Sequence, residues 1–357
     1  MPANPTTDRL LAAKSGGPGA GSAVGAAGAA GAASAPGPAD PAAGLAPVTD
    51  LARRIARSLA NVLNGKLDAI EATITTLLAG GHLLLEDVPG VGKTTLATAL
   101  ARSIEAKVQR IQFTSDLLPT DVTGLSIYDQ ERHAFQFHPG PIFTNIAIGD
   151  EVNRATPKTQ SALLEAMGEH AVTVDGRTHR LPPLFMVVAT QNPQDMEGTF
   201  PLPEAQRDRF MTRISLGYPD AEAELAMLAA RGTADPADAV TPIATIDEVL
   251  AARQAVAAVH LADEAARYLV AVVAATREHP GIALGGSPRA TLHLARMARA
   301  RAAMRGRAFV SPDDIASLAG TVLPHRLEAR GRFATVGEAH RAASSVVAEI
   351  VARTPVR

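Results

Sequence analysis

The sequence lacks cysteine and tryptophan altogether, and aromatic residues make up only 3% of its 357 residues. Without cysteine there can be no disulfide and no thiolate metal site, and this composition fits a reducing compartment such as the cytoplasm. The formal net charge is only -2, whereas constitutive nucleic-acid binders usually concentrate basic residues on one face. We therefore expect a cytoplasmic protein with no nucleic-acid partner.

Long apolar runs are also missing. A helix that crosses a bilayer needs about 20 largely apolar residues, and the longest candidate run, around residues 268–275, is far shorter. With 46% hydrophobic residues, the chain can still bury one or two sizeable cores. Residues 1–48 are almost entirely Ala, Gly, Pro and Ser, which predicts a disordered arm rather than a secretory signal.

A phosphate-binding loop is predicted after the apolar run Leu83–Leu85. A turn rich in glycine and proline follows this run, and a helix-compatible segment begins at Lys93. Glycines let backbone N–H groups curl around an anion, and the helix adds the positive end of its dipole. Lys93 is predicted to reach the outer phosphates, and Thr94 to bind Mg²⁺. The predicted nucleotide-binding residues of this segment are Val88, Pro89, Gly90, Val91, Gly92, Lys93, Thr94 and Thr95.

Asp87 departs from the usual phosphate-loop pattern. The pattern G-x-x-x-x-G-K-[ST] has glycine at the position that Asp87 holds here. A carboxylate so near a triphosphate would repel it. We therefore expect the Asp87 side chain to turn away from the loop or to be paired.

Polar residues follow two further apolar strands. Asp150 and Glu151 end the run that begins at Ile146, and Asn192 follows the strand predicted at residues 185–189. Ligands of open parallel sheets bind beyond the carboxyl ends of the strands. Asp150 is thus predicted to hold Mg²⁺, Glu151 to deprotonate the attacking water, and Asn192 to contact the γ-phosphate or that water. Taken singly, the acids could be surface charge and Asn192 an ordinary turn residue.

Two β-hairpins are predicted within this α/β core. Residues 125–137 alternate around a polar turn, and residues 172–181 surround Asp175-Gly176, a favoured two-residue turn. Both could also be simple decorations of the sheet edge. Two helices broken near Asn64-Gly65 are expected to precede the first strand, and Thr156-Pro157 predicts a helix that ends at Gly168.

From about residue 221 onward, helical signals dominate. Thr245 with Glu248 and Ser311 with Asp314 predict helix caps, and Asp263 is expected to cap another helix. The sequence Ser287-Pro288-Arg289 places an arginine in a first turn, where the helix dipole disfavours a cation by ~0.3–1 kcal/mol unless an anion is near. The arginines between residues 296 and 307 are expected to form a solvated basic face.

These features, in this order, resemble the MoxR family of AAA+ ATPases over roughly residues 50–355. The matching segments are Leu85–Thr94, Asp116–Gly124, Gly149–Ala155, Gln160–Met167, Ala189–Pro193, Pro201–Phe210 and Gly286–Ala290. The resemblance implies an α/β AAA+ P-loop NTPase core (49–220) with a parallel sheet and β-hairpin insertions, and a small all-helical lid domain (221–357). It leaves outside only the arm (1–48), for which the composition predicts disorder.

The resemblance also implies roles for individual residues. Lys93 and Thr94 match Walker A, and Asp150 and Glu151 match Walker B. Asn192 matches sensor 1, and Arg289 matches sensor 2, which reads the nucleotide from the lid. Arg209 matches an arginine finger that reaches a neighbouring subunit, although Arg207 is a nearby alternative. The predicted catalytic residues are thus Glu151, Asn192, Arg209 and Lys93.

The family further implies ATP and Mg²⁺ as cofactors, a ring of subunits that is expected to be hexameric, and chaperone-like remodelling or maturation of a client protein, often with a von Willebrand factor A domain protein. Three alternatives stay open. A magnesium-chelatase-type motor subunit would differ mainly in its partner. A kinase would need an acceptor in place of water. A nucleotide-binding scaffold would not hydrolyse ATP, contrary to what Glu151 beside Asp150 indicates.

Overall fold

The computed structural model describes residues 43–63, 65–192, 199–219, 221–222, 224–225 and 236–356. Several sequence predictions lie outside these residues: most of the expected arm (1–42), Asn64, Pro193, and residue 220 at the expected boundary between core and lid. No helix of the described residues is long and apolar enough to cross a membrane.

Five parallel strands form the central sheet in the order β2-β5-β8-β1-β9. The strands are β1 (Leu83–Glu86), β2 (Val108–Gln112), β5 (Ile146–Asp150), β8 (Met186–Gln191) and β9 (Thr212–Ile214). Because all five run in the same direction, their carboxyl ends meet at one edge of the sheet. The parallel sheet inferred from the sequence is confirmed.

Helices cover both faces of the sheet, as its buried strands require. Leu83 and Leu85 share a core with α2 (Ala46–Ala60), α3 (Leu67–Leu78) and α4 (Lys93–Ser103). Leu84 points to the other face, in a second core with α6 (Pro157–Glu169). This alternation follows from the period of two along a strand.

Two helix boundaries differ from the sequence prediction. A 3-10 turn, η1 (Ala43–Leu45), and α2 begin before the expected end of the arm at residue 48, because Leu45 and Val48 are buried in the core. Helix α6 continues past Gly168, and His170 takes the left-handed conformation with φ 49° instead. Apolar packing and a tolerated positive φ thus override the glycine signal.

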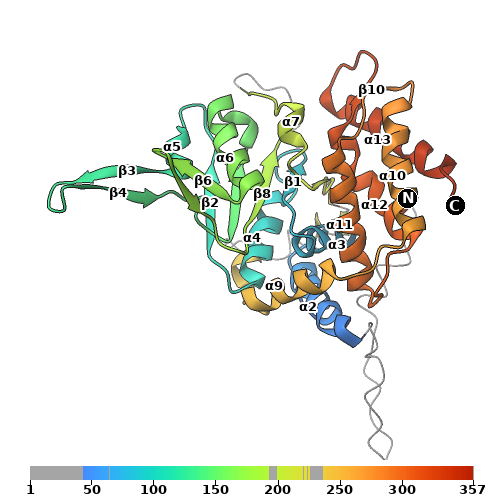
Figure 1. Ribbon diagram of the computed structural model, residues 1–357, viewed down its shortest axis with the longest axis horizontal. Helices are drawn as coiled ribbons and strands as arrows, with labels where there is room; N and C mark the ends of the chain where they lie inside the picture. Colours follow the sequence, from blue (N-terminus) through green and yellow to red (C-terminus); the bar gives the residue numbers. More distant parts are fainter. Residues whose placement is uncertain are drawn as a thin grey trace, which may run out of the picture.

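Both predicted hairpins are confirmed. Strands β3 (Gly124–Asp129) and β4 (Ala134–Pro139) form an antiparallel pair that extends far from the sheet (Figure 1). A short helix, α5 (Pro119–Thr123), precedes them. Strands β6 (Ala171–Val174) and β7 (Arg177–Arg180) turn at Asp175 and Gly176, whose φ angles of 50° and 74° suit a two-residue hairpin turn.

The carboxyl-terminal part forms a helical lid that packs beside the core on the side of α2 and α3 (Figure 1). Two short helices of the core, η2 (Val152–Arg154) and α7 (Glu204–Arg207), precede the lid in the chain. The described elements of the lid are η3 (Pro236–Ala239), α9 (Ile246–Ala257), α10 (Asp263–Glu278), β10 (Ile282–Leu284), α11 (Pro288–Met304), α12 (Pro312–Val322), η4 (Pro324–Arg326), β11 (Glu328–Ala329) and α13 (Val336–Arg353). The lid is therefore helical apart from the small antiparallel ribbon β10-β11.

The predicted caps of α9 and α12 are present, since the side chains of Thr245 and Ser311 accept the expected backbone hydrogen bonds. Asp263, by contrast, is the first residue of α10 rather than its cap, which is Ala262. The prediction was wrong by one position. An acidic side chain still lies in the first turn, where the helix dipole favours it.

The expected solvated basic face on α11 was also wrong in part. Arg301 and Arg305 lie near Glu71 of α3 and near Asp314 of α12, and Arg307 donates to Asp314 at 2.6 and 2.8 Å. The Asp314 side chain is 1% exposed, and that of Arg301 is 12% exposed. A buried carboxylate requires such cations around it. Because Arg301 and Arg305 also reach Glu71 of α3, these two arginines join lid and core.

Candidate functional site

The predicted phosphate loop connects β1 to α4. Gly90 and Gly92 have φ angles of 83° and 93°, in a region that side-chain-bearing residues rarely adopt. Lys93 begins α4 and is 9% exposed. Its ammonium donates to the backbone oxygens of Asp87 and Val88 and to the side-chain oxygen of Asn192, the last at 2.7 Å. Burial lowers the pKa of Lys93, although nearby carboxylates oppose the shift.

The Asp87 carboxylate turns away from the loop and is paired, which is the outcome expected from the sequence. One oxygen accepts hydrogen bonds from the hydroxyl of Ser215 at 2.8 Å and from the backbone N–H of Gly217 at 2.6 Å. The other accepts from the N–H of Val88 at 2.8 Å. Burial by itself would raise the pKa of Asp87, but these donors outweigh it and the net shift is downward. The carboxylate thus fastens the loop to the segment after β9.

Asp150, at the end of β5, faces the start of α4. Its Oδ1 accepts hydrogen bonds from the hydroxyls of Thr94 and Thr190, each at 3.2 Å. Its Oδ2 accepts from Nε of Arg110 at 2.5 Å. The residue is 3% exposed. A hydroxyl and a carboxylate side by side are the oxygen ligands that Mg²⁺ prefers.

The described residues include no cluster of three or more His, Asp or Glu side chains that could hold a metal ion alone. Thr94 and Asp150 therefore fit a magnesium ion that takes its remaining ligands from a nucleotide and water.

Glu151 follows immediately and has φ 56°, the left-handed region that is costly for a residue with a side chain. Its backbone N–H donates to the Thr190 hydroxyl at 3.1 Å, which fixes this conformation. The carboxylate accepts from Gln112 at 3.1 Å and from the amide of Asn192 at 3.4 Å, and it pairs with Arg154 at 3.2 Å. Asn192 therefore lies between Lys93 and Glu151.

The structure thus brings together five predicted site residues at one edge of the sheet: Lys93, Thr94, Asp150, Glu151 and Asn192. It does not bring Arg209 and Arg289 to them. In the described part of the chain, neither arginine has a hydrogen bond or ion pair with the phosphate loop, Asp150 or Glu151. The sensor 2 role that the resemblance implied for Arg289 stays a prediction.

Arg209 and Arg289 instead line a separate cavity of about 260 Å³, together with Arg296 of α11. Arg209 donates to the backbone oxygen of Leu164 in α6. Arg289 lies 3.5 Å from Asp208. The cavity is basic, and burial near arginines lowers the pKa of its His293 to about 2, so that imidazole stays neutral.

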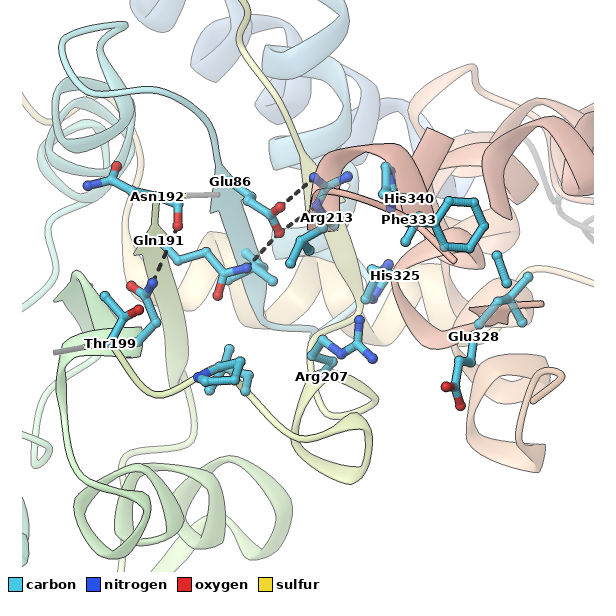
Figure 2. Close-up of a pocket in the computed structure, with 18 of the residues that line it drawn as sticks. Glu86, Gln191, Asn192, Thr199, Arg207, Arg213, His325, Glu328, Phe333 and His340 are labelled. Carbon is cyan, nitrogen blue, oxygen red and sulfur yellow. Dashed lines mark hydrogen bonds and ion pairs between the residues drawn. The ribbon is translucent and has the colours of Figure 1, made fainter. Parts of the chain in front are cut away.

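A larger cavity, of about 340 Å³, lies between the sheet edge and the lid (Figure 2). Glu86 at the end of β1 forms a bidentate pair with Arg213 of β9 at 2.7 and 2.8 Å and accepts from Gln191 at 2.6 Å. Burial alone would raise the pKa of Glu86, but Arg213 outweighs it and the net shift is downward. Arg207 lines this cavity, whereas Arg209 lines the smaller one.

Sequence reasoning missed Thr190 and Arg110, which contact Asp150, and Gln112 and Arg154, which contact Glu151. Arg110 and Gln112 lie two residues apart on β2, and the register pairs Gln112 with Asp150. Alternation along β2 could have placed both side chains on one face. The register that brings them to Asp150 depends on strand pairing.

Comparison with known proteins agrees with this arrangement. Residues 82–212 match the ATPase family associated with various cellular activities (AAA), and residues 274–349 match an AAA lid domain. The chain is 49% identical to YeaC of Bacillus subtilis over 266 residues, 74% of this chain and 83% of that protein. It is 42% identical to the chaperone MoxR1 of Mycobacterium tuberculosis over 296 residues, 80% of this chain and 78% of that protein.

A third relative, the protein MoxR of Methylorubrum extorquens, is 33% identical over 78% of this chain and 88% of its own length. Among solved structures, a candidate ATPase from Cytophaga hutchinsonii superposes with a TM-score of 0.77 at 35% identity, covering 88% of this chain and 96% of that one. The fold is therefore shared with that solved structure, and the chain belongs to the MoxR family of AAA+ ATPases.

Proposed function

We propose that this protein hydrolyses ATP, with Mg²⁺, and uses the reaction to remodel or mature a client protein. The observation that carries the proposal is the meeting of a buried lysine, a hydroxyl beside a carboxylate, and a glutamate beside an amide at one edge of the sheet. These are the parts that phosphoryl transfer to water requires.

Each residue then has one task. Backbone N–H groups of residues 90–92 and the amino-terminal end of α4 hold the phosphates, and Lys93 exchanges its carbonyl partners for phosphate oxygens. Thr94 and Asp150 would hold Mg²⁺, which would neutralise charge on the phosphates. Glu151 takes a proton from the attacking water, and Asn192 orients that water while keeping Glu151 and Lys93 in place.

We further propose that Arg209 and Arg289 act on the nucleotide of a neighbouring copy. Support comes from the cavity that both arginines line, which lies away from the phosphate loop of their own chain. A second subunit would bring a triphosphate to them, and such an arginine in trans is worth ~10³–10⁵ in rate. Turnover therefore requires assembly, for which a hexameric ring is the arrangement we propose.

Client remodelling is supported by the β3-β4 hairpin. Its side chains include Tyr128 and Phe135, which are 48% and 69% exposed. Their rings meet edge to face, with the ring centroids 5.3 Å apart. Exposed aromatic residues on a projecting hairpin suit contact with another protein. One relative is named a chaperone. A partner with a von Willebrand factor A domain and a cytoplasmic location remain part of the proposal.

The test measures phosphate release from ATP and Mg²⁺ without any acceptor substrate, over a range of protein concentrations. We expect release whose specific rate rises with concentration. Lys93→Ala should lose nucleotide binding. Lys158→Ala, which changes an exposed lysine on α6, should retain nucleotide binding and phosphate release. Nucleotide binding without phosphate release by the assembled wild-type protein would support the scaffold instead. Formation of a chelatase complex would favour the magnesium-chelatase-type motor.

A further inference from the structure

Asp208 joins the core to the lid at the segment that carries Arg209. It follows α7 directly. Its carboxylate accepts hydrogen bonds from three donor groups of the lid. These are Nε of Arg326 at 3.0 Å, the hydroxyl of Ser287 at 3.0 and 3.1 Å to its two oxygens, and a guanidinium nitrogen of Arg289 at 3.5 Å. One side chain of the core thus contacts both η4 and the start of α11.

Arg326 makes this contact strong. The residue is only 4% exposed, and its guanidinium also contacts Nδ1 of His293 at 2.5 Å and the backbone oxygen of Met211 at 3.2 Å. Burial lowers its pKa to about 10, so it remains a cation at neutral pH. A buried cation needs a counter-charge. Asp208 is the carboxylate with which Arg326 forms an ion pair in the described part of the chain.

Ser287 and Arg289 tie the same carboxylate to the beginning of α11. Ser287 caps the helix by accepting from the N–H of Ala290 at 3.3 Å while its hydroxyl donates to Asp208. Arg289, in the first turn, would be disfavoured by the helix dipole. The Asp208 anion beside it offsets that cost. The sequence indicated that an anion should lie near Arg289, and that anion is the Asp208 side chain of the same subunit.

The consequence is a fixed relationship between two arginines from different domains. Arg209 is the next residue after Asp208, and Arg289 and Arg296 lie on the helix that Asp208 holds. All three line the same cavity of about 260 Å³, and the described residues that line it include no acidic side chain. Three cations that face one cavity suit a polyphosphate, and the Asp208 carboxylate that pairs with Arg289 at 3.5 Å is not among the residues that line it.

We propose that Asp208 is a positioning residue for ATP hydrolysis in the neighbouring subunit. By clamping η4 and α11 to the segment after α7, it holds Arg209 of the core and Arg289 of the lid in the one arrangement that meets the neighbour's phosphates. This inference rests on the proposed function, because it requires that the arginines act in trans. A rival explanation is that Asp208 only stabilises the fold.

Mixed assemblies separate these explanations. Asp208→Asn keeps the size of the side chain but removes its charge. Assayed alone, this variant should show a kcat lowered by roughly 10²-fold, which is part of the ~10³–10⁵ rate factor that an arginine in trans supplies. Its KM for ATP should be unchanged, because its own phosphate loop is intact. Mixed with Glu151→Gln, which has an inactive site but intact arginines, it should regain activity, because its own site now meets a correct neighbour.

Three mixtures serve as controls. Arg209→Ala with Glu151→Gln should also regain activity, which tests the trans arrangement by itself. Asp208→Asn with Arg209→Ala should stay inactive, because both subunits present defective arginines. Asp263→Asn, an exposed aspartate on the lid, should hydrolyse ATP like the wild type in every mixture.

The outcomes test separately the positioning role of Asp208 and the action of the arginines in trans. If the Arg209 mixture recovers and the Asp208 mixture does not, the positioning role is wrong while the trans arrangement holds. If neither recovers, the trans arrangement is wrong and the role of Asp208 with it. Should Asp208→Asn fail to fold, Ser287→Ala leaves the buried pair intact and must lower kcat without changing KM. An unchanged kcat would then overturn the proposal.

Discussion

The ammonium group of Lys93 lies 2.7 Å from the side-chain oxygen of Asn192, although the two residues are 99 positions apart along the chain. The amide nitrogen of Asn192 lies 3.4 Å from Glu151. A single neutral side chain therefore links the cation that would hold phosphate to the carboxylate that would activate water. Because an amide donates at one end and accepts at the other, only one orientation satisfies both partners.

Glu151→Gln is expected to lower ATP turnover by roughly 10²–10⁴-fold, the range that general base catalysis supplies. Binding of ATP should persist, because Lys93 and the loop backbone are unchanged. Single-turnover phosphate release and nucleotide-binding titrations measure the two effects separately. The control is Glu165→Gln, an exposed glutamate on α6. Wild-type turnover in Glu151→Gln would remove Glu151 from this role.

Arg110→Gln is expected to reduce the Mg²⁺ concentration needed for half-maximal turnover. Arg110 contacts Asp150 at 2.5 Å and so competes with a metal ion for the same carboxylate. Its side chain is 60% exposed, so the pair is worth only about 0.5–1 kcal/mol, which corresponds to roughly a twofold to fivefold shift. Arg177→Gln on β7 is the control. A higher Mg²⁺ requirement in Arg110→Gln would show that Arg110 assists the metal site.

Asp87→Asn is expected to destabilise the fold at neutral pH. The carboxylate accepts hydrogen bonds from Ser215, Gly217 and Val88, and being partly exposed it contributes about 1 kcal/mol. Because these contacts hold the pKa of Asp87 below its ordinary value, the contribution is present above about pH 4 and is lost as the pH falls through the folded-state pKa.

Urea denaturation of Asp87→Asn and the wild type, from pH 7 down to the lowest pH at which both fold, checks this expectation. The difference in unfolding free energy should shrink in acid. Glu165→Gln, an exposed glutamate in the interior of α6, should show little difference at any pH. A gap between Asp87→Asn and the wild type that stays constant to the lowest pH would mean that the charge of Asp87 does not contribute.

Phe135→Ser is expected to weaken capture of the client without slowing basal ATP hydrolysis. Phe135 is 69% exposed and lies close to the turn of the β3-β4 hairpin, which projects away from the central sheet (Figure 1). The measurement is pull-down with the Glu151→Gln variant as bait, with and without Phe135→Ser. The matched control is Phe309→Ser, which removes an exposed aromatic residue from the lid. Equal capture of the client by Glu151→Gln with and without Phe135→Ser would show that the client does not bind through Phe135.

Periodicity and turn chemistry predicted most of the fold. The phosphate loop, both hairpins, the strand that ends at Asp150 and the strand that directly precedes Asn192 depend on local patterns that the structure retains. What local patterns do not contain is the pairing of distant strands. The position of Arg110 against Asp150 follows from the register of β2 with β5, which two segments 40 residues apart determine together.

The placement of the lid could not be predicted for the same reason. A motif assigns Arg289 to the first turn of a helix but gives no direction in which that helix docks. Docking depends on Arg326, which the sequence analysis did not single out, and on its burial against Asp208. Likewise, arginines expected on a solvated face are drawn inward by Asp314. Buried acids that gather cations are visible only after packing is known.

The two helices that precede the first strand belong to the same hydrophobic cluster as the lid. Leu51 and Ile55 of α2 share it with Leu96 of α4 and with Leu294 and Met297 of α11. The match to the AAA family begins only at residue 82. A truncated protein that started there would expose the apolar flanks of α4 and α11 to water, and it should aggregate rather than yield a working ATPase fragment.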